Sequence, residues 1–188
     1  MTRPMRRDAA RNRDRLLTVA AAVFTEQGLA GSLEEVARRA GVSIGTLYNH
    51  FPTRDALVDA LLPVRIAAVD EFAALAAAEP DPWRAFTGFL ENMLVQLTAD
   101  RGLLDAFTGH PSAALVAAAC ERGLVHLAAV FDRARRAGVI RADAGDADIT
   151  HLLWALALLG ENAGEAAARR SLHFVLDGLR ASEPVART

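Results

Sequence analysis

The sequence has little cysteine and no lysine: among its 188 residues only Cys120 is a cysteine, and every Lys/Arg position is an arginine. A single cysteine excludes an internal disulfide, and with it the class of small secreted domains that disulfides hold together. The missing lysine indicates a GC-rich genome rather than a chemical requirement, because arginine and lysine differ in function only where a planar guanidinium is needed. We therefore expect a cytoplasmic protein.

Long apolar runs are missing too. Segment 152–160 is among the longest, and it has roughly half of the ~20 residues that a membrane-spanning helix needs, so no membrane partner is expected. Residues 11–24 superficially suggest a signal peptide. However, Asp8 and Asp14 interrupt the basic part, and the apolar residues follow helical spacing. We therefore interpret this segment as an amphipathic helix. With 52% of its residues hydrophobic and 23% charged, the chain has the composition of a globular protein.

Alanine is abundant, with 40 residues, and it favours helix because it costs least to place in one. Stretches of helical pattern are separated by capping residues and glycines, and no β-strand of any length is found. The predicted N-caps are Ser32 with Glu35 as a capping box, Ser43, Thr53, Asp81, and Asp146 or Asp148, and the predicted helix ends include Gly28, Gly41 and Gly138. We predict an all-α fold with about nine helices.

One proline lies inside a helical pattern. Residues 53–78 read as a long helix, and Pro63 removes a backbone N–H from its interior. We expect a kink or break there, which could transmit motion between the two parts of the chain.

Charge is distributed unevenly along the chain. Residues 1–57 carry nine arginines against six acids, for a net charge of +3, and residues 58–188 carry twelve against seventeen, for −5. This asymmetry indicates that the two parts meet different partners. We predict an N-terminal domain of residues 1–57 and a larger helical domain of residues 58–188.

Two short helical patterns in residues 32–54 are joined at Gly41. Ala37 is small where the second helix would cross, Gly41 permits the left-handed backbone of a tight turn, and Leu47 fills the angle between the helices. Leu47, Phe51 and Val36 are expected in the core of this module. The spacing is that of a helix-turn-helix, whose second helix enters the DNA major groove. Because any two short capped helices can mimic it, the spacing by itself leaves DNA binding open.

Residues 43–51, Ser-Ile-Gly-Thr-Leu-Tyr-Asn-His-Phe, resemble the recognition helix of the TetR family of transcriptional repressors. The resemblance extends back through residues 36–37 and 40–41 and forward to residues 53–57. The rest of the chain is similar to the family only in its length, its all-helical character and its placement. The resemblance implies a three-helix DNA-binding module followed by a helical domain for ligand binding and dimerisation.

The resemblance also implies which residues contact DNA: Ser32, Ser43, Ile44, Gly45, Thr46, Tyr48, Asn49, His50 and Arg54. Thr46 and Asn49 suit base edges, and Gly45 allows a close approach. Ser43, Tyr48 and His50 suit phosphates, and so do Ser32, which stands where the family often has a threonine, and Arg54, which stands where relatives usually have a lysine. Ile44 either contacts a thymine methyl or packs inside the module.

Other arginines of this part have two interpretations. Arg38 and Arg39 fit a solvated helix face better than a DNA contact. The arginines of residues 3–15 fit equally an arm that follows the DNA backbone or minor groove and an ordinary terminal tail.

The larger part offers a dimer interface and a ligand cavity. The helical pattern of residues 148–164 is apolar around most of its circumference, so a second subunit would cover one face, unless the monomer buries it completely. We predict a homodimer through the last two helices. The candidate lining of a small-molecule cavity is Phe86, Phe89, Met93, Phe107, Cys120, Leu124 and Trp154, and each of these residues also fits an ordinary helical core.

Enzymatic interpretations find no support. The five histidines contain no pair at metal-ligand spacing, and there is no glycine-rich phosphate loop, so neither a metal nor a cofactor is expected. We predict a homodimeric, ligand-responsive regulator that binds double-stranded operator DNA, a repressor released from a palindrome by a small-molecule inducer. The alternative is a helical ligand-binding or protein-interaction module that has lost DNA binding; a small helical enzyme is the third.

Overall fold

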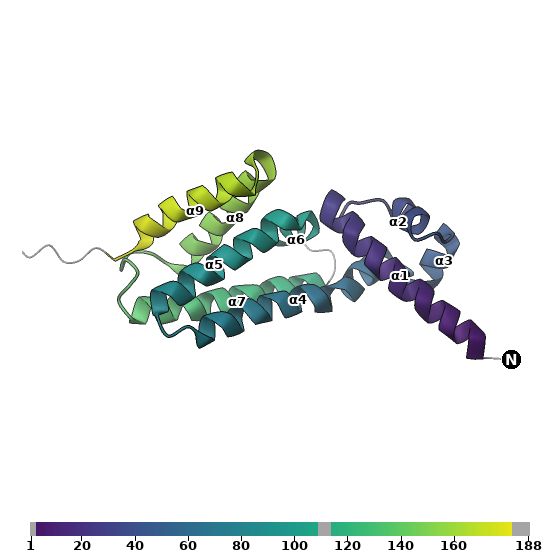
Figure 1. Ribbon diagram of the computed structural model, residues 1–188, viewed down its shortest axis with the longest axis horizontal. Helices are drawn as coiled ribbons and strands as arrows, with labels where there is room; N and C mark the ends of the chain where they lie inside the picture. The colour runs from purple at the N-terminus through teal and green to yellow at the C-terminus, as the bar shows by residue number, and fades with distance from the viewer. Residues whose placement is uncertain (1–2, 109–113, 182–188) are drawn as a thin grey trace, which may run out of the picture. The chain divides into compact units, whose positions relative to one another are not determined.

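The structure is a computed structural model that describes residues 3–108 and 114–181, without the side chains of residues 3–9, 62–66, 103, 106–108 and 114–120. Within these residues every regular element is a helix, which confirms the predicted all-α fold (Figure 1). The helices are α1 (Arg3–Gln27), α2 (Leu33–Arg39), α3 (Ile44–His50), α4 (Arg54–Ala78), α5 (Pro82–Ala99), α6 (Arg101–Thr108), α7 (Ala114–Arg136), α8 (Asp146–Ala163) and α9 (Glu165–Leu179).

The helices pack into two compact units. The first unit contains α1, α2, α3, α6 and the part of α4 up to Arg65, and the second contains α5, α8, α9, the part of α4 from Ile66 and the part of α7 from Cys120. Each unit is therefore built from two separate stretches of chain. The predicted domain boundary after residue 57 stays a prediction about independent folding.

Side-chain caps begin the short helices of the first unit. The Ser32 hydroxyl accepts the Glu35 N–H at 3.2 Å, and the Ser43 hydroxyl accepts the Thr46 N–H at 3.1 Å, as predicted. The capping box at α2 is wrong in its second half, because the Glu35 carboxylate bonds to Arg38 and Arg39 instead of reaching back. Two guanidinium groups on the same helix offer the carboxylate stronger, charge-assisted hydrogen bonds than a backbone N–H does.

A glycine turn joins α2 to α3. Gly41 has φ +65°, and its N–H bonds to the Arg38 carbonyl while the Val42 N–H bonds to the Ala37 carbonyl. These two bonds are the Schellman arrangement that ends a helix at a left-handed residue. Ala37 and Leu47 are buried in the angle between the helices, which confirms their predicted packing roles.

Of the kink or break predicted at Pro63, the break is wrong, because α4 continues as a helix from Arg54 to Ala78, and the kink stays a prediction. An interior proline costs about 3 kcal/mol or more through one lost hydrogen bond and one clash. A helix of 25 residues keeps its other backbone bonds on both sides of that point, so continuing costs less than stopping.

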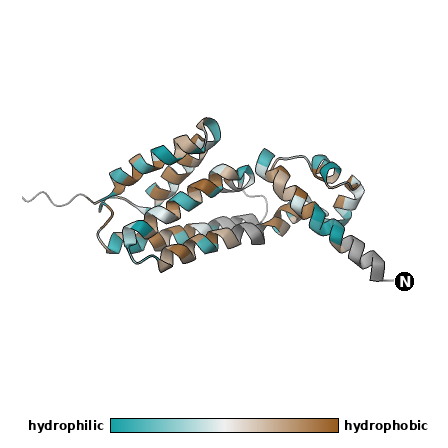
Figure 2. Cartoon of the chain, viewed as in Figure 1, coloured by the Kyte–Doolittle hydropathy of each residue, from teal (hydrophilic) through white to brown (hydrophobic). Residues whose placement is uncertain are grey.

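Helices α5, α8 and α9 pack against one another in the second unit, and α8 and α9 lie side by side (Figure 1). Phe86 of α5 and Phe131 of α7 are fully buried, with ring centroids 6.1 Å apart. Apolar residues recur at helical spacing along α9, so that one face is buried and the other stays exposed (Figure 2). The buried residues are Ala168, Leu172, Leu176 and Leu179. This amphipathic pattern positions α9 over the core.

Of the remaining predicted caps, two are confirmed and one is wrong. Thr53 accepts the Ala56 N–H at 3.1 Å at the start of α4, as predicted. Asp81 accepts the Trp83 N–H at 2.8 Å at the start of α5, as predicted. At α8 the N-cap is Gly145, not Asp146 or Asp148; the Asp148 carboxylate accepts the Gly145 N–H at 2.9 Å instead. An acid in the first turn can reach back to the cap residue while its own backbone is already helical.

Candidate nucleic-acid interface

The predicted recognition helix α3 exposes the side chains that could meet a partner and buries the one that holds it in place. Leu47 is fully buried, and Phe51, which follows the helix, is 2% exposed. Tyr48 is 45% exposed and Ile44 37%. Of the other predicted contacts, Ser43, Gly45 and Asn49 are exposed and Thr46 and His50 are half-buried, so all seven are on one accessible segment.

Two of the predicted contact hydroxyls bond to each other. Ser43 and Thr46 lie 2.9 Å apart, in addition to the cap bond from the Thr46 N–H. Each hydroxyl has a second lone pair or a rotatable proton for another partner. The Ser32 hydroxyl donates to Glu34 at 2.8 Å. A backbone hydrogen bond, and after it this bond from Ser32, lower the pKa of the Glu34 carboxyl.

Arg54 is directed into the first unit. Its Nη1 donates to the carbonyl of Leu29 at 2.8 Å and to the carbonyl of Gly31 at 2.6 Å, and its guanidinium lies 6.0 Å from the Phe24 ring centroid. The side chain therefore stabilises the turn between α1 and α2. Its predicted phosphate contact has to come from the other nitrogens.

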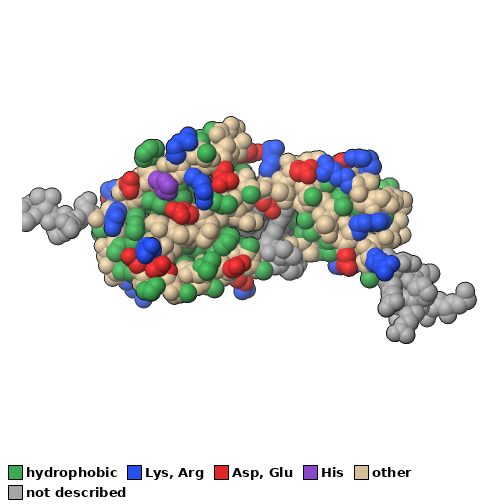
Figure 3. Space-filling model, in the orientation of Figure 1, with side chains coloured by type: hydrophobic (Ala, Val, Ile, Leu, Met, Phe, Trp, Pro, Cys, Tyr) green, Lys and Arg blue, Asp and Glu red, His purple; other side chains and the backbone are tan. Residues whose placement is uncertain are grey.

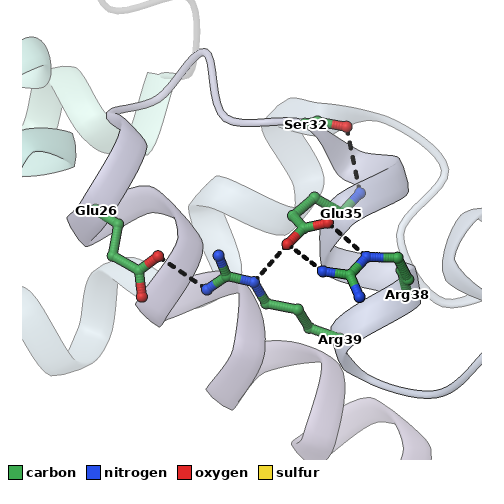
Figure 4. Close-up of polar contacts among 5 residues, drawn as sticks. All are labelled: Glu26, Ser32, Glu35, Arg38 and Arg39. Carbon is green, nitrogen blue, oxygen red and sulfur yellow. Dashed lines mark hydrogen bonds and ion pairs between the residues drawn. The ribbon is translucent and has the colours of Figure 1, made fainter.

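Glu35 is the centre of an ion-pair network that runs from α2 to α1 (Figure 4). Its carboxylate accepts two bonds from Arg38, at 2.7 and 2.6 Å, and one from Arg39 at 2.7 Å. Arg39 also donates to Glu26 of α1 at 2.8 Å. These donors lower the pKa of Glu35 to about 2. Both arginines therefore have a structural partner on this face, and Arg39 joins α2 to α1.

The first helix places a further arginine at the end of the recognition helix. The Arg13 guanidinium lies 5.1 Å from the centroid of the Phe51 ring, which directly follows α3. A cation over an aromatic face is held by the ring's quadrupole while its N–H donors stay available. Figure 3 shows blue arginine side chains on the surface of this unit.

The sequence did not predict the role of one residue of this unit, Asp105. The Asp105 carboxylate of α6 accepts the Leu29 N–H at 2.8 Å, within the turn that Arg54 holds. Nothing around Asp105 in the sequence signals this role. By contrast, the Glu35 to Arg39 pair is visible as an acid four residues before a base.

The residues predicted to line a ligand cavity are mostly core. Phe86, Phe89 and Met93 are at most 3% exposed, whereas Leu124 is 37% exposed. Trp154 is half-buried, with its ring centroid 5.8 Å from that of His151. The side chains of Phe107 and Cys120 lie outside the described residues.

The cavities of the second unit have other linings. A groove of about 540 Å³ lies between α4 and α7, with alanines along α4 at 73, 74, 76 and 77. At its polar end the Asp70 carboxylate accepts two hydrogen bonds from the Arg122 guanidinium, at 2.8 and 2.9 Å, and lies 2.8 Å from Nε2 of His126. The bonds from Arg122 lower the pKa of the Asp70 carboxyl most, and the bond with His126 lowers it further. A second concavity, of about 840 Å³, is lined by arginines.

In the part of the chain that the structure describes, no three His, Cys, Asp or Glu side chains group as metal ligands. None of the described helices is both long and apolar enough to cross a membrane.

The capped helices α2 and α3, joined at Gly41, define a helix-turn-helix protein with a second helical unit. Residues 16–61 match the family described as bacterial regulatory proteins, tetR family, and residues 81–181 match the description Transcriptional regulator SbtR-like, C-terminal domain. The chain belongs to the TetR family of transcriptional regulators.

Solved structures agree over nearly the whole chain. The TetR transcriptional regulator SCO0520 from Streptomyces coelicolor is 35% identical, covers 91% of this chain and 99% of its own, and has a TM-score of 0.62. A TetR transcription regulatory protein from Mycobacterium vanbaalenii is 38% identical, covers 95% and 100%, and has a TM-score of 0.59.

Curated relatives match over a shorter stretch. The HTH-type transcriptional repressor KstR2 from Mycobacterium tuberculosis is 45% identical over 51 residues, which are 27% of this chain and 26% of KstR2. The chain thus spans about a quarter of the length of that relative, so the likeness concerns a short segment only.

Proposed function

We propose that this protein is a cytoplasmic, homodimeric repressor that binds palindromic operator DNA through α3 and is released by a small-molecule inducer, acting by binding and not by catalysis. The observation that carries the proposal is the exposure of α3. A seven-residue helix fixed by the buried Leu47 presents Tyr48 at 45% exposure, together with the exposed Asn49, on an accessible segment.

Each contact follows from the chemistry of its side chain. Thr46 and Asn49 read base edges in the major groove, with Gly45 allowing close approach and Ile44 meeting a thymine methyl. Ser32, Ser43, Tyr48 and His50 bind phosphates, which set the register of the protein on the duplex. The nitrogens of Arg54 that the Leu29 and Gly31 carbonyls leave open are the remaining candidate phosphate contact.

Dimerisation is supported by the exposed apolar side chains of the last two helices. Phe174 of α9 is 76% exposed and Leu158 of α8 43% exposed. Leaving a phenylalanine in water forfeits roughly 1.5–3 kcal/mol of burial free energy, which a second copy on this face would recover. One recognition helix also covers too few base pairs for useful specificity, and a dimer doubles the site.

Inducer binding is supported by the groove between α4 and α7. Its volume of about 540 Å³ lies in the range of ligand pockets. The alanine wall suits an apolar ligand body, and the charged cluster of Asp70, Arg122 and His126 suits one polar group. These residues replace the aromatic core positions as the first candidates for the inducer site.

The test is fluorescence anisotropy of the full chain with DNA from the region upstream of its own gene. Asn49→Ala and Thr46→Ala should each weaken binding by about 5- to 150-fold, as loss of a base contact of about 1–3 kcal/mol requires. Asn92→Ala, a half-buried amide on α5 and outside the last two helices, is the matched control and should leave affinity unchanged.

The salt series of the same experiment separates this function from its rival. Affinity for a palindromic site should fall steeply with salt, because bound phosphates release counterions. Absence of any binding at low salt would instead identify a helical ligand-binding or protein-interaction module that has lost DNA binding.

A further inference from the structure

Helices α7 and α9 of the second unit both end at the left of Figure 1. A concavity of about 840 Å³ at these two ends has four arginines in its lining. Its lining includes Arg135 and Arg136 from the last turn of α7, Arg141 and Asp143 from the loop that follows, and Arg180 just after α9. Segments far apart in the sequence thus bring four guanidinium groups to one hollow, and one carboxylate with them.

Arg141 builds the wall of this concavity. Its guanidinium makes two bonds to Asp143, at 2.6 and 2.8 Å, so the two charges cancel. Backbone bonds from Arg141 N–H to the Leu179 carbonyl and from Ala181 N–H to the Val139 carbonyl join the loop to the end of α9. These hydrogen bonds therefore hold the loop after α7 against the end of α9, and the two segments together form the wall of the concavity.

The other three arginines keep donors available. Arg135 bonds to the Asp132 carboxylate through Nη2 at 3.1 Å, and Arg136 bonds to the Asp132 carbonyl through Nε at 3.2 Å. Arg180 lies 5.4 Å from the centroid of the Trp83 ring. A cation–π contact with an indole holds a guanidinium without consuming its N–H groups.

Capping of a helix end explains only part of this arrangement. Basic residues in a last turn neutralise the partial negative charge of the helix C-terminus, which accounts for Arg135 and Arg136. It does not account for Arg180, which approaches from α9 and is held by Trp83. Four guanidinium groups against Asp143, Asp132 and two helix ends of about −0.5 each leave an excess of roughly one positive charge.

We propose that this concavity is a binding site for a phosphate-bearing small molecule, separate from DNA binding and from the groove between α4 and α7. Donors from Arg135, Arg136 and Arg180 approach from two elements, which suits the three terminal oxygens of a phosphate better than the two of a carboxylate. The volume leaves room for a sugar-sized body attached to the phosphate.

The test is isothermal titration calorimetry of the full chain with inorganic phosphate and with ribose 5-phosphate, at constant ionic strength. Saturable binding of ribose 5-phosphate is expected, with acetate and chloride giving no saturable heat. Binding of acetate as tight as that of phosphate would overturn the assignment to phosphate. Absence of saturable binding for both phosphate probes would overturn the site.

Charge-matched variants localise the binding. Arg136→Gln with Arg180→Gln should weaken ribose 5-phosphate binding at least tenfold. Arg169→Gln with Arg170→Gln removes the same charge from exposed positions on α9 outside the concavity and should change it less than twofold. If both double variants lose the same amount of ribose 5-phosphate affinity, the binding is a nonspecific attraction to positive charge, which would overturn the proposal.

A second pair of substitutions keeps the experiment decisive if loss of the contact between Arg180 and Trp83 unfolds the protein. Arg135→Gln with Arg136→Gln changes two exposed side chains on α7, and the same tenfold loss is expected. Operator affinity without phosphate, measured on the same variants, should match the wild type, so failure of this site and failure of DNA binding are distinguishable.

Discussion

The Asp105 carboxylate accepts the backbone N–H of Leu29 at 2.8 Å, directly above Gly28. Arg54 binds the carbonyls of Leu29 and Gly31 in the same turn. The turn between α1 and α2 is thus held by one side chain of α6 and one of α4, an acceptor for its N–H and a donor for its carbonyls. Since α2 follows this turn, both side chains contribute to the position of the helix-turn-helix.

Replacing Asp105 should destabilise the first unit. Asp105→Ala removes the acceptor of the Leu29 N–H and should lower the free energy of unfolding by about 1 kcal/mol, measured by urea denaturation. Asp105→Asn keeps an acceptor oxygen and should lose less. Asp177→Ala, an exposed acid on α9, serves as control. An Asp105→Ala loss no larger than that of the control would show that the bond contributes nothing.

Replacing Arg54 should cost more, because two carbonyls lose a charged donor. Arg54→Ala is expected to lower the free energy of unfolding by about 2 kcal/mol. Its effect on the salt dependence of operator binding decides the second role: a slope reduced by about 1 means a phosphate contact as well. An unchanged slope with lower stability would confine Arg54 to the turn.

Acid should weaken the network around Glu35. The pKa of this carboxyl is about 2 in the folded protein, below its ordinary value of 4.5, so the stabilisation is complete above that ordinary value. It should be lost as the pH falls from about 4.5 towards about 2, since the unfolded chain takes up the proton first. Thermal unfolding measured across this range tests the prediction.

The matched variants for that titration are Glu35→Gln and Glu121→Gln, the second being exposed on α7. Glu35→Gln should flatten the dependence of the melting temperature on pH in this window, and Glu121→Gln should retain it. A wild-type curve that coincides with the Glu35→Gln curve would refute the role of the network.

The crossing of α5 and α8 depends on a glycine. A Cβ at Gly160 would collide with Cγ2 of Thr98 and lie 3.3 Å from the Ala168 Cβ. Gly160→Ala should therefore destabilise by about 1–3 kcal/mol, although alanine favours a helix interior over glycine. Thr98→Ser removes the colliding methyl group and should recover part of the loss in the double variant, measured by thermal unfolding. If the two variants' losses of stability simply add in the double variant, the Thr98 methyl group is not the cause of the Gly160→Ala loss.

The exposed phenylalanine of α9 tests the dimer. Phe174→Arg should convert the protein to a monomer in analytical ultracentrifugation, because a charge on each copy would face the other across the interface. Val125→Arg on α7, at a position 61% exposed, is the control and should stay dimeric. A monomeric wild type, or a dimeric Phe174→Arg, would exclude this interface.

Local patterns in the sequence were sufficient for most of the fold. Ser32, Ser43 and Asp81 cap their helices as predicted, and Gly41 takes its positive φ, because these bonds join residues that are neighbours along the chain. Where two local bonds compete, the pattern fails. Glu35 can reach either the cap or two arginines, and only the side-chain geometry decides.

By itself, the sequence determined the helices, the helix-turn-helix and the residues exposed on α3, since helix periodicity and capping are local properties. Only the tertiary structure decided that Arg54 points inward to Leu29 and Gly31, and that Asp105 reaches that turn from α6. It also decided that Phe86 and Phe89 are core and that arginines of α7 and α9 share one concavity. Such contacts join residues far apart in the chain, and they depend on how the helices pack rather than on any local pattern.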